Sequence, residues 1–340
     1  MRDAVQDYYG QHLQSSDDLQ TDACCTDANL PDFVKAALSQ IHDAVLTRYY
    51  GCGLIAPEAL AGRSILDLGC GAGRDVFVLS KLVGPEGHVV GVDMTDEQLA
   101  VARAHVDYHM TTFGYDRPNV RFLQGYLEEL DRLELLARSF DVIVSNCVIN
   151  LCTDKPKVLR DAFRLLKPGG EMYFSDVYAQ TPVPETLTHD LELYGECLSG
   201  ALFWEDFNTL AVEAGFAIPR IVDARPLAIS NARVAEKLGN LEFASVTYRL
   251  FKPQDVEGTR DAMRATYHGT IEHHADALAF DRGHVFRTSE AVVIDGATAA
   301  LIASSRLGQH FTLEVSDRPA AYETAVMDPF RMMAGKPSCC

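Results

Sequence analysis

The sequence contains no apolar run that approaches the roughly 20 residues a helix needs to span a bilayer. Its first residues, from Met1 to Asp7, are polar and lack the apolar core of a signal peptide. We therefore expect a cytoplasmic protein that does not have a membrane as a partner.

The sequence also has far fewer basic than acidic residues. The chain has 30 Lys and Arg against 48 Asp and Glu, which gives a formal net charge of −18. So large an excess of negative charge repels phosphate backbones and anionic lipid surfaces. Nucleic acid is therefore not an expected partner.

Cysteine pairs with the spacing of a zinc site are missing. Nine cysteines occur, at positions 24, 25, 52, 70, 147, 152, 197, 339 and 340, and none of them form a Cys-x-x-Cys motif. This absence disfavours a zinc ribbon or finger. In a cytoplasmic chain of 340 residues, these cysteines indicate metal binding or catalysis rather than a disulfide scaffold.

What is present is an alternation of short apolar strands with amphipathic helices. The expected strands are Ser64–Leu68, His88–Asp93, Val120–Gln124, Phe140–Asn146 and Gly170–Tyr178. The expected helices between them are Arg74–Leu82, Thr95–Thr112, Leu127–Ala137 and Lys155–Leu166. This alternation predicts an α/β fold with a mostly parallel sheet and helices on both faces. Ligands should bind at the carboxyl ends of its strands.

Four regions follow from these patterns. Residues 1–60 should form a helical segment that carries Cys24 and Cys52 and includes a helix over Asp32–Tyr50. Residues 61–221 should form the α/β core. In residues 222–328 strand-like segments lose the alternation with helices, which indicates a smaller α+β domain. Residues 329–340 are expected to be a flexible tail that ends in two cysteines.

A glycine-rich turn, Gly69 to Gly73, follows the first strand and allows a ligand to approach the backbone closely. Asp93 lies about 20 residues further on, where a carboxylate can accept ribose hydroxyls. A nicotinamide-binding Rossmann domain has similar glycines. Asp67, two residues before the turn, and the Lys167–Gly170 turn before the fifth strand favour the class I S-adenosylmethionine-dependent methyltransferase pattern instead.

Three cysteines occupy places that a substrate could reach. Cys147 follows the fourth strand at its carboxyl end, Cys52 is flanked by two glycines, and Cys197 follows the fifth strand. Each of them, taken alone, could be an ordinary buried thiol. A thiol at the mouth of a cofactor site indicates a soft, sulfur-seeking substrate.

Motifs well beyond the glycine turn are similar to those of one enzyme family, the arsenite methyltransferases. The similarity covers nearly the whole chain and rests on Tyr8–Gly10, Asp18–Thr21, Tyr49–Gly53, Gly73–Asp75, His88–Thr95, Asp107–Met110, Ser145–Leu151, Tyr173–Tyr178 and Gly195–Cys197. Members of the family often have serine where this chain has Cys70, and they usually lack Cys25 and Cys152.

This resemblance implies a reaction, the methylation of arsenite to methylarsenite and dimethylarsenite. Arsenite and methylated arsenicals would be the substrates, and Cys52, Cys147 and Cys197 would bind trivalent arsenic. Cys24 would pair with Cys52 in a disulfide during turnover, and thioredoxin or glutathione would reduce that bond.

The resemblance also implies a site for S-adenosylmethionine in the core region. Together with Asp93, its expected residues are Tyr50, Asp67, Gly69, Cys70, Gly71, Met94, Gln98, Leu127, Glu128 and Asn146.

Two other functions stay open at this point. A class I methyltransferase acting on a small organic substrate, such as a quinone or sterol, would use the same glycine turn but would leave Cys52, Cys147 and Cys197 without a task. A thiol-rich arsenic-binding protein without catalysis would not need the turn or Asp93.

Overall fold

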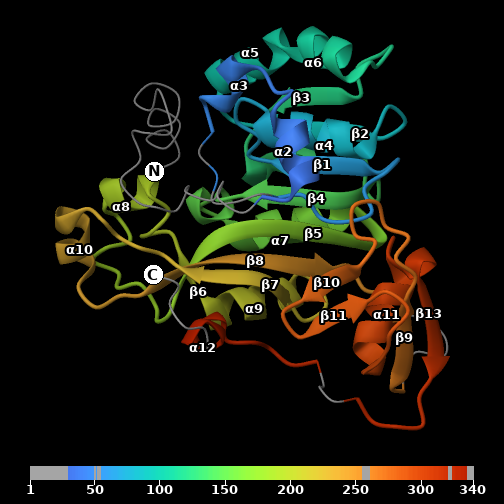
Figure 1. Cartoon of the computed structure of the whole chain (residues 1–340). Coiled ribbons are helices and arrows are strands. Elements are labelled where there is room, and N and C mark those ends of the chain that lie inside the picture. The colour runs from blue at the N-terminus through green and yellow to red at the C-terminus, as the bar shows by residue number, and fades with distance from the viewer. Residues whose placement is uncertain (1–29, 50, 52–54, 255–260, 321–323, 335–340) are drawn as a thin grey trace.

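The computed structural model describes residues 30–49, 51, 55–254, 261–320 and 324–334. Its centre is an eight-stranded sheet with the order β3-β2-β1-β4-β5-β8-β7, in which β6 pairs with β5 (Figure 1). The strands are β1 (Ser64–Leu68), β2 (His88–Asp93), β3 (Val120–Gln124), β4 (Phe140–Asn146), β5 (Leu166–Ala179), β6 (Leu202–Phe203), β7 (Arg220–Pro226) and β8 (Phe243–Phe251). Strand β8 runs antiparallel to both of its neighbours, and the other pairings in this sheet are parallel.

Helices cover both faces of the central sheet (Figure 1). They are α2 (Asp32–Leu38), α3 (Asp43–Leu46), α4 (Arg74–Val83), α5 (Asp96–Ala104), α6 (Val106–Phe113), η5 (Leu127–Arg132), η6 (Ile149–Leu151), α7 (Lys155–Leu165), α8 (Leu191–Gly195), α9 (Trp204–Glu213), α10 (Ala232–Leu238) and α12 (Pro329–Ala334). Along β1, Ile65 packs in a cluster with α4 and α5, whereas Leu66 packs in a second cluster with α7 and α9. Because β1 is buried on both faces, its sequence is an almost continuous apolar run.

A group of smaller elements follows β8, and we call it the C-terminal module. It comprises β9 (Met263–Tyr267), β10 (Ala277–Asp281), β11 (His284–Arg287), β12 (Ala291–Ile294), α11 (Gly296–Ser304), η7 (Gly308–His310) and β13 (Phe311–Val315). These elements form a three-stranded sheet, β12-β9-β13, and a two-stranded sheet, β10-β11, around a hydrophobic cluster of their own.

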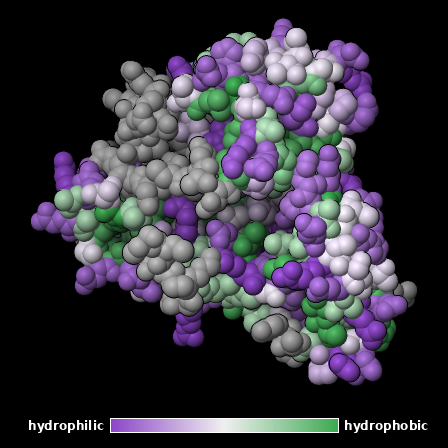
Figure 2. Space-filling model, in the orientation of Figure 1, coloured by the Kyte–Doolittle hydropathy of each residue, from purple (hydrophilic) through white to green (hydrophobic). Residues whose placement is uncertain are grey.

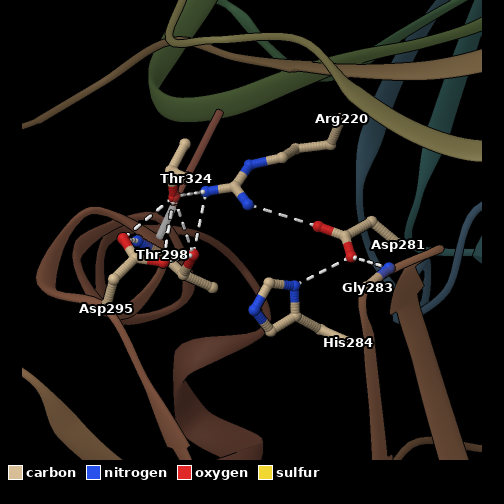
Figure 3. A network of polar contacts seen from close by, with 7 residues as sticks. All are labelled: Arg220, Asp281, Gly283, His284, Asp295, Thr298 and Thr324. Atoms are coloured by element: carbon tan, nitrogen blue, oxygen red, sulfur yellow. Dashed lines mark hydrogen bonds and ion pairs between the residues drawn. The ribbon is translucent and has the colours of Figure 1, made fainter. Parts of the chain in front are cut away.

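A buried polar network joins this module to the central sheet (Figure 3). Arg220 of β7 lies 3.3 Å from Asp281 of β10 and donates to the hydroxyls of Thr298 and Thr324 at 2.9 and 2.8 Å. Asp281 is in turn within 2.9 Å of the His284 ring. Arg220 and Asp281 are only 4% and 3% exposed, so their charges compensate one another away from water.

The strand bounds predicted from the sequence are confirmed for β1 to β4, whereas the strand predicted over Gly170–Tyr178 is longer and spans Leu166–Ala179 as β5. The single helix expected over Thr95–Thr112 is wrong, because the chain leaves helical geometry at His105 and divides into α5 and α6. The His105 ring nitrogen Nδ1 lies 2.8 Å from the Val101 carbonyl oxygen and competes for an acceptor that a continuing helix would use.

Other expected helices are also shorter than the sequence suggests. The helix expected over Asp32–Tyr50 is divided into α2 and α3, and Leu127–Ala137 is helical only as far as Arg132. Within η5 the backbone kinks at Glu129. Among the described residues, none of the helices combines the length and apolar character that crossing a membrane requires.

The central sheet does not stop at residue 221, where the sequence analysis places the edge of the core. Strand β7 crosses that position and β8 continues the sheet, so the strands that stand apart begin at β9. The reason is that a strand's sequence does not reveal which sheet it joins.

The start of the expected flexible tail is ordered as helix α12. The Asp328 carboxylate accepts the backbone N–H groups of Phe330 and Arg331 at 2.8 and 3.3 Å, which caps the helix. Phe330 packs into the core cluster beneath β7 and β8. Cys339 and Cys340 lie outside the described residues.

Candidate active site

A cavity opens at the carboxyl ends of β1, β2 and β4, and we call it the cofactor cavity. It is lined by ten of the eleven residues that the sequence analysis assigns to the cofactor, namely Asp67, Gly69, Cys70, Gly71, Asp93, Met94, Gln98, Leu127, Glu128 and Asn146. The eleventh, Tyr50, lies outside the described residues. The structure therefore brings together residues that lie up to 79 positions apart, from Asp67 to Asn146.

The glycine turn forms the floor of this cavity. Gly69 and Gly71 have φ angles of +80° and +51°, which side chains rarely adopt. A Cβ on Gly69 would come within 2.5 Å of the Val148 side chain, whereas a Cβ on Gly71 would meet nothing within 4 Å. Gly69 is thus required for packing, while the Gly71 backbone faces open space that a ligand can fill.

Asp93 is held in place at the end of β2. One carboxylate oxygen accepts the Gly71 N–H and the other accepts the Thr95 N–H, both at 2.8 Å. Burial raises the pKa of Asp93, and these two N–H groups oppose that effect. Each carboxylate oxygen has a second lone pair, so the group can also accept two ribose hydroxyls.

Asp67 and Cys70 are buried beside the turn. Burial raises the pKa of Asp67 well above its usual range, and the nearby carboxylates of Asp75 and Asp93 add to the rise. Burial likewise raises the pKa of the Cys70 thiol. The Cys70 sulfur packs on Gly91, where an added Cβ would lie only 2.7 Å away. Cys70 is therefore a packing residue under the cavity rather than a reactive thiol.

A cluster of side chains from Tyr49, Arg74, Asp75 and Asn146 forms another wall of the cavity. The sequence analysis did not predict that these residues contact one another. The Asn146 amide donates to the Tyr49 hydroxyl at 2.7 Å and to the Asp75 carboxylate at 3.0 Å. The Arg74 guanidinium lies 3.3 Å from the centre of the Tyr49 ring. The motifs Tyr49–Gly53 and Gly73–Asp75 signalled this cluster, but their contact cannot be read from the sequence.

Glu128 also lines the cavity, and a second contact fixes its position. One of its carboxylate oxygens accepts the backbone N–H and the hydroxyl of Thr153, at 2.8 and 3.0 Å. This contact joins η5 to the loop before α7.

Two of the three predicted arsenic ligands meet beside the cofactor cavity. The Cys197 sulfur lies 3.3 Å from the Cys147 carbonyl oxygen, and Cys147 also lines the cavity. Both residues have left-handed backbone conformations, with φ angles of 54° and 59°. Such conformations are strained for a residue with a side chain and cluster at functional sites. Cys147 is part of a disulfide bond, whereas Cys197 is not.

The short loop that carries Cys147 is fixed from below by Asp176. This buried carboxylate accepts the backbone N–H of Asn150 at 3.1 Å and its side-chain amide at 2.7 Å. The Tyr194 hydroxyl donates to the Leu151 carbonyl at 2.9 Å, which ties the same loop to the segment that carries Cys197. The two cysteines therefore belong to one hydrogen-bonded unit.

Comparisons with known proteins agree with this geometry. A methyltransferase-domain model matches residues 60–215, and a model for the arsenite methyltransferase C-terminal domain matches residues 260–338. The arsenite methyltransferase of Aquipseudomonas alcaligenes is 51% identical over 92% of this chain and 90% of its own length. The human arsenite methyltransferase is 46% identical over 91% of this chain and 82% of its own length. The chain belongs to the arsenite methyltransferase family.

A solved structure from this family supports the assignment. The crystal structure of an arsenic(III) S-adenosylmethionine methyltransferase from Chlamydomonas reinhardtii has a TM-score of 0.80 and 41% identity, and covers 88% of this chain and 100% of its own. The predicted fold class, an α/β class I methyltransferase core with a smaller C-terminal part, is confirmed.

In this member of the arsenite methyltransferase family, four cysteines are expected at the site, and the structure describes two of them, Cys147 and Cys197. Cys24 and Cys52 lie outside the described residues, so their assignments stay predictions. Within the described part of the chain, no group of three or more His, Cys, Asp or Glu side chains is arranged to hold a metal ion. The described part of the predicted arsenic site therefore consists of Cys147 and Cys197, two of its three expected ligands.

Proposed function

We propose that this protein is a cytoplasmic arsenite methyltransferase that converts arsenite to methylarsenite and dimethylarsenite, and so serves arsenic detoxification. The observation that carries the proposal is the meeting of Cys147 and Cys197 at the edge of the cofactor cavity. A methyltransferase for a small organic substrate has no need of two thiols there, and a protein that only sequesters arsenic has no need of the cavity.

The cavity suits S-adenosylmethionine. Asp93 would accept the ribose hydroxyls, Gly69 and Gly71 would let the ligand lie against the backbone, and Met94 and Leu127 would supply apolar walls for the adenine. The open space over Gly71 is where a side chain would otherwise intrude. When bound, S-adenosylmethionine supplies a methyl group attached to a positively charged sulfur. That sulfur keeps the electron pair of the carbon–sulfur bond when the methyl group is transferred.

Cys147 and Cys197, with Cys52 as a third ligand, would hold the substrate arsenic. Thiolates are the natural ligands of soft ions, and we extend this preference to trivalent arsenic. Three sulfur ligands leave the arsenic lone pair free to attack the methyl carbon, so no general base is needed. The enzyme's contribution is then mainly positioning, with the two reacting atoms held roughly 3–3.5 Å apart.

Formation of the arsenic–carbon bond consumes the arsenic lone pair and leaves the product pentavalent. Two electrons must return to arsenic, and Cys24 and Cys52 would supply them by forming a disulfide. Thioredoxin or glutathione would reduce that disulfide for the next cycle.

Replacement of either described ligand tests this proposal. Cys147→Ser and Cys197→Ser should each lower arsenite methylation at least ~100-fold, because removing one ligand misplaces arsenic relative to the methyl group. The measurement is mass-resolved product analysis after incubation with arsenite, S-adenosylmethionine and a dithiol. Cys24→Ser should still methylate methylarsenite while failing on arsenite.

The matched control is Cys152→Ser, which removes a thiol that also lines the cofactor cavity but is not an expected arsenic ligand, and it should leave the products unchanged. Calorimetric titration with S-adenosylmethionine should give the same affinity for all of these proteins. Full turnover of arsenite by Cys147→Ser or Cys197→Ser would refute the ligand assignment.

A further inference from the structure

A second cavity, with a volume of about 430 Å³, lies on another side of the molecule. Its walls come from α2, from residues 57–63, from the end of α4, and from loops of the C-terminal module. In Figure 1 the orange chain of the module rises beside the blue N-terminal segment. The volume is within the range of about 300–1,000 Å³ that is typical of small-molecule sites.

The lining of this cavity is unusual for so acidic a protein, because its uncompensated charges are positive. Arg63 and Lys81 line it, together with the imidazoles of His273, His274 and His310. Of the two carboxylates in the wall, Glu58 is ion-paired with the buried Arg249. The other belongs to Glu272, which is 79% exposed at the rim.

Arg63 is only partly neutralised. Its guanidinium lies 3.8 Å from Asp141, but that carboxylate already accepts from Lys167 at 2.7 Å and from the Ser64 N–H at 2.9 Å. The Arg63 Nε atom is buried and has no hydrogen-bond partner among the described residues. His310 lines the same cavity, and its burial together with the charge of Arg63 lowers the pKa of its imidazole. A buried, unpaired donor of this kind is rare in folded proteins.

The cavity also offers an apolar surface. Phe33 stacks on the His273 ring, with the ring centres 4.4 Å apart and the planes 3° from parallel. Ala36, Leu60 and Ile271 complete that side of the wall.

The backbone at this cavity is strained in the same way as at the arsenic cysteines. Among the described residues, six other than glycine have positive φ angles, and two of these, Ala59 and His273, line this cavity. Two of the remaining four are Cys147 and Cys197. His273 adopts this conformation within a turn, in which the His274 N–H donates to the Ile271 carbonyl oxygen at 3.0 Å.

We propose that this second cavity binds a small organic anion, with its carboxylate at Arg63 and its apolar body against Phe33 and Ile271. Such a ligand joins α2 to the C-terminal module. It occupies a site that is separate from the cofactor cavity and from the cysteines, so the proposal does not depend on the methylation reaction.

Isothermal titration calorimetry of the full-length protein with benzoate tests the proposal. Benzamide, which has a similar shape but no charge, is the control ligand. The expected result is saturable binding of benzoate, unchanged by saturating S-adenosylhomocysteine, and at least about tenfold weaker binding of benzamide. Arg63→Gln should weaken benzoate binding by about tenfold or more, since it removes a charge-assisted hydrogen bond.

Ala36→Trp provides a second variant that fills the cavity from the exposed side of α2 and should abolish binding, even if Arg63→Gln proves poorly folded. Arg117→Gln is the control, because Arg117 is 78% exposed and its ion-pair partner among the described residues is the exposed Glu86. Absence of saturable benzoate binding, equal affinity in Ala36→Trp, or displacement by S-adenosylhomocysteine would each overturn the proposal.

Discussion

At the scale of single residues, the site depends on positions that hold unfavourable conformations or environments. Cys147 and Cys197 have left-handed backbones, and a strained residue of this kind costs on the order of 1–3 kcal/mol. Asp176, which fixes the Cys147 loop, is a buried carboxyl. These local costs are offset by the packing and hydrogen bonds of the surrounding loop.

The protonation of Asp176 gives a pH-dependent stability with a definite sign. Burial raises the pKa of Asp176 to about 7, against the opposing effect of backbone N–H groups. In the unfolded chain an aspartate loses its proton near about pH 4. Between these values the folded state binds more protons, so the contribution of Asp176 to stability is full below about pH 4 and is lost as pH rises through 7.

Chemical denaturation of the protein and of Asp176→Asn from pH 5 to pH 8 checks this sign. As pH rises, the unfolding free energy of the native protein should fall relative to that of Asp176→Asn by at most about 1.4 kcal/mol per pH unit. The difference should become constant above pH 7. The exposed Asp206→Asn is the control and should give a constant difference. A pH-independent difference for Asp176→Asn would show that the carboxyl is ionised throughout.

Much of the site could be predicted at this scale, because residue types with distinctive chemistry sit in recognisable motifs. The turn around Gly69, the acid Asp93 and Cys147 line one cavity at the carboxyl ends of the strands, and the Cys197 sulfur lies beside the Cys147 backbone. The contact of Tyr49 with Asn146 could not be predicted, since the two residues lie 97 positions apart and no pattern couples them.

At the scale of elements, the connection from β1 to α4 determines the shape of the cofactor cavity. Strands β1, β2 and β4 could be predicted to the residue because they are buried on both faces and read as short apolar runs. The helices were less predictable. Breaks such as that at His105 arise from single side-chain hydrogen bonds, which leave the helical pattern of apolar residues intact.

Gly69→Ala tests the role of this connection. The added Cβ meets Val148 at 2.5 Å in a backbone with φ of +80°, so the turn must shift. We expect a loss of about 1–3 kcal/mol in unfolding free energy and at least roughly tenfold weaker binding of S-adenosylmethionine by calorimetry.

Gly62→Ala is its matched control. Gly62 has a similar φ of +70°, but an added Cβ there meets nothing within 4 Å. It should show the strain cost without any change in cofactor affinity. Equal cofactor affinities for the two variants would contradict the role given to Gly69.

At the scale of the whole molecule, the chain is one α/β core to which the C-terminal module is attached. The face in Figure 2 is covered mostly by hydrophilic residues, with apolar residues in separate small groups, as the net charge of −18 leads one to expect. The attachment of the module could not be predicted, because the pattern of β7 and β8 resembles that of the later strands. Their place in the central sheet is set by long-range pairing.

The network around Arg220 should make a large contribution to this attachment (Figure 3). Among the described residues, Arg220→Met leaves the buried Asp281 carboxylate with the His284 ring and the Gly283 N–H as its polar partners. We expect a loss of about 3–5 kcal/mol in unfolding free energy, measured by urea denaturation. Arg121→Met, which removes an exposed pair with Glu134, should cost at most about 1 kcal/mol. A loss in Arg220→Met no larger than in this control would show that the network is dispensable.

The central claim is that sulfur atoms of Cys147 and Cys197 bind arsenic beside the cofactor cavity. X-ray absorption at the arsenic edge, on reduced protein loaded with arsenite and without S-adenosylmethionine, tests it most directly. The account predicts a shell of three sulfur atoms that loses sulfur, or loses bound arsenic altogether, in Cys147→Ser and in Cys197→Ser. An oxygen shell in the native protein, or a three-sulfur shell that survives both replacements, would contradict it.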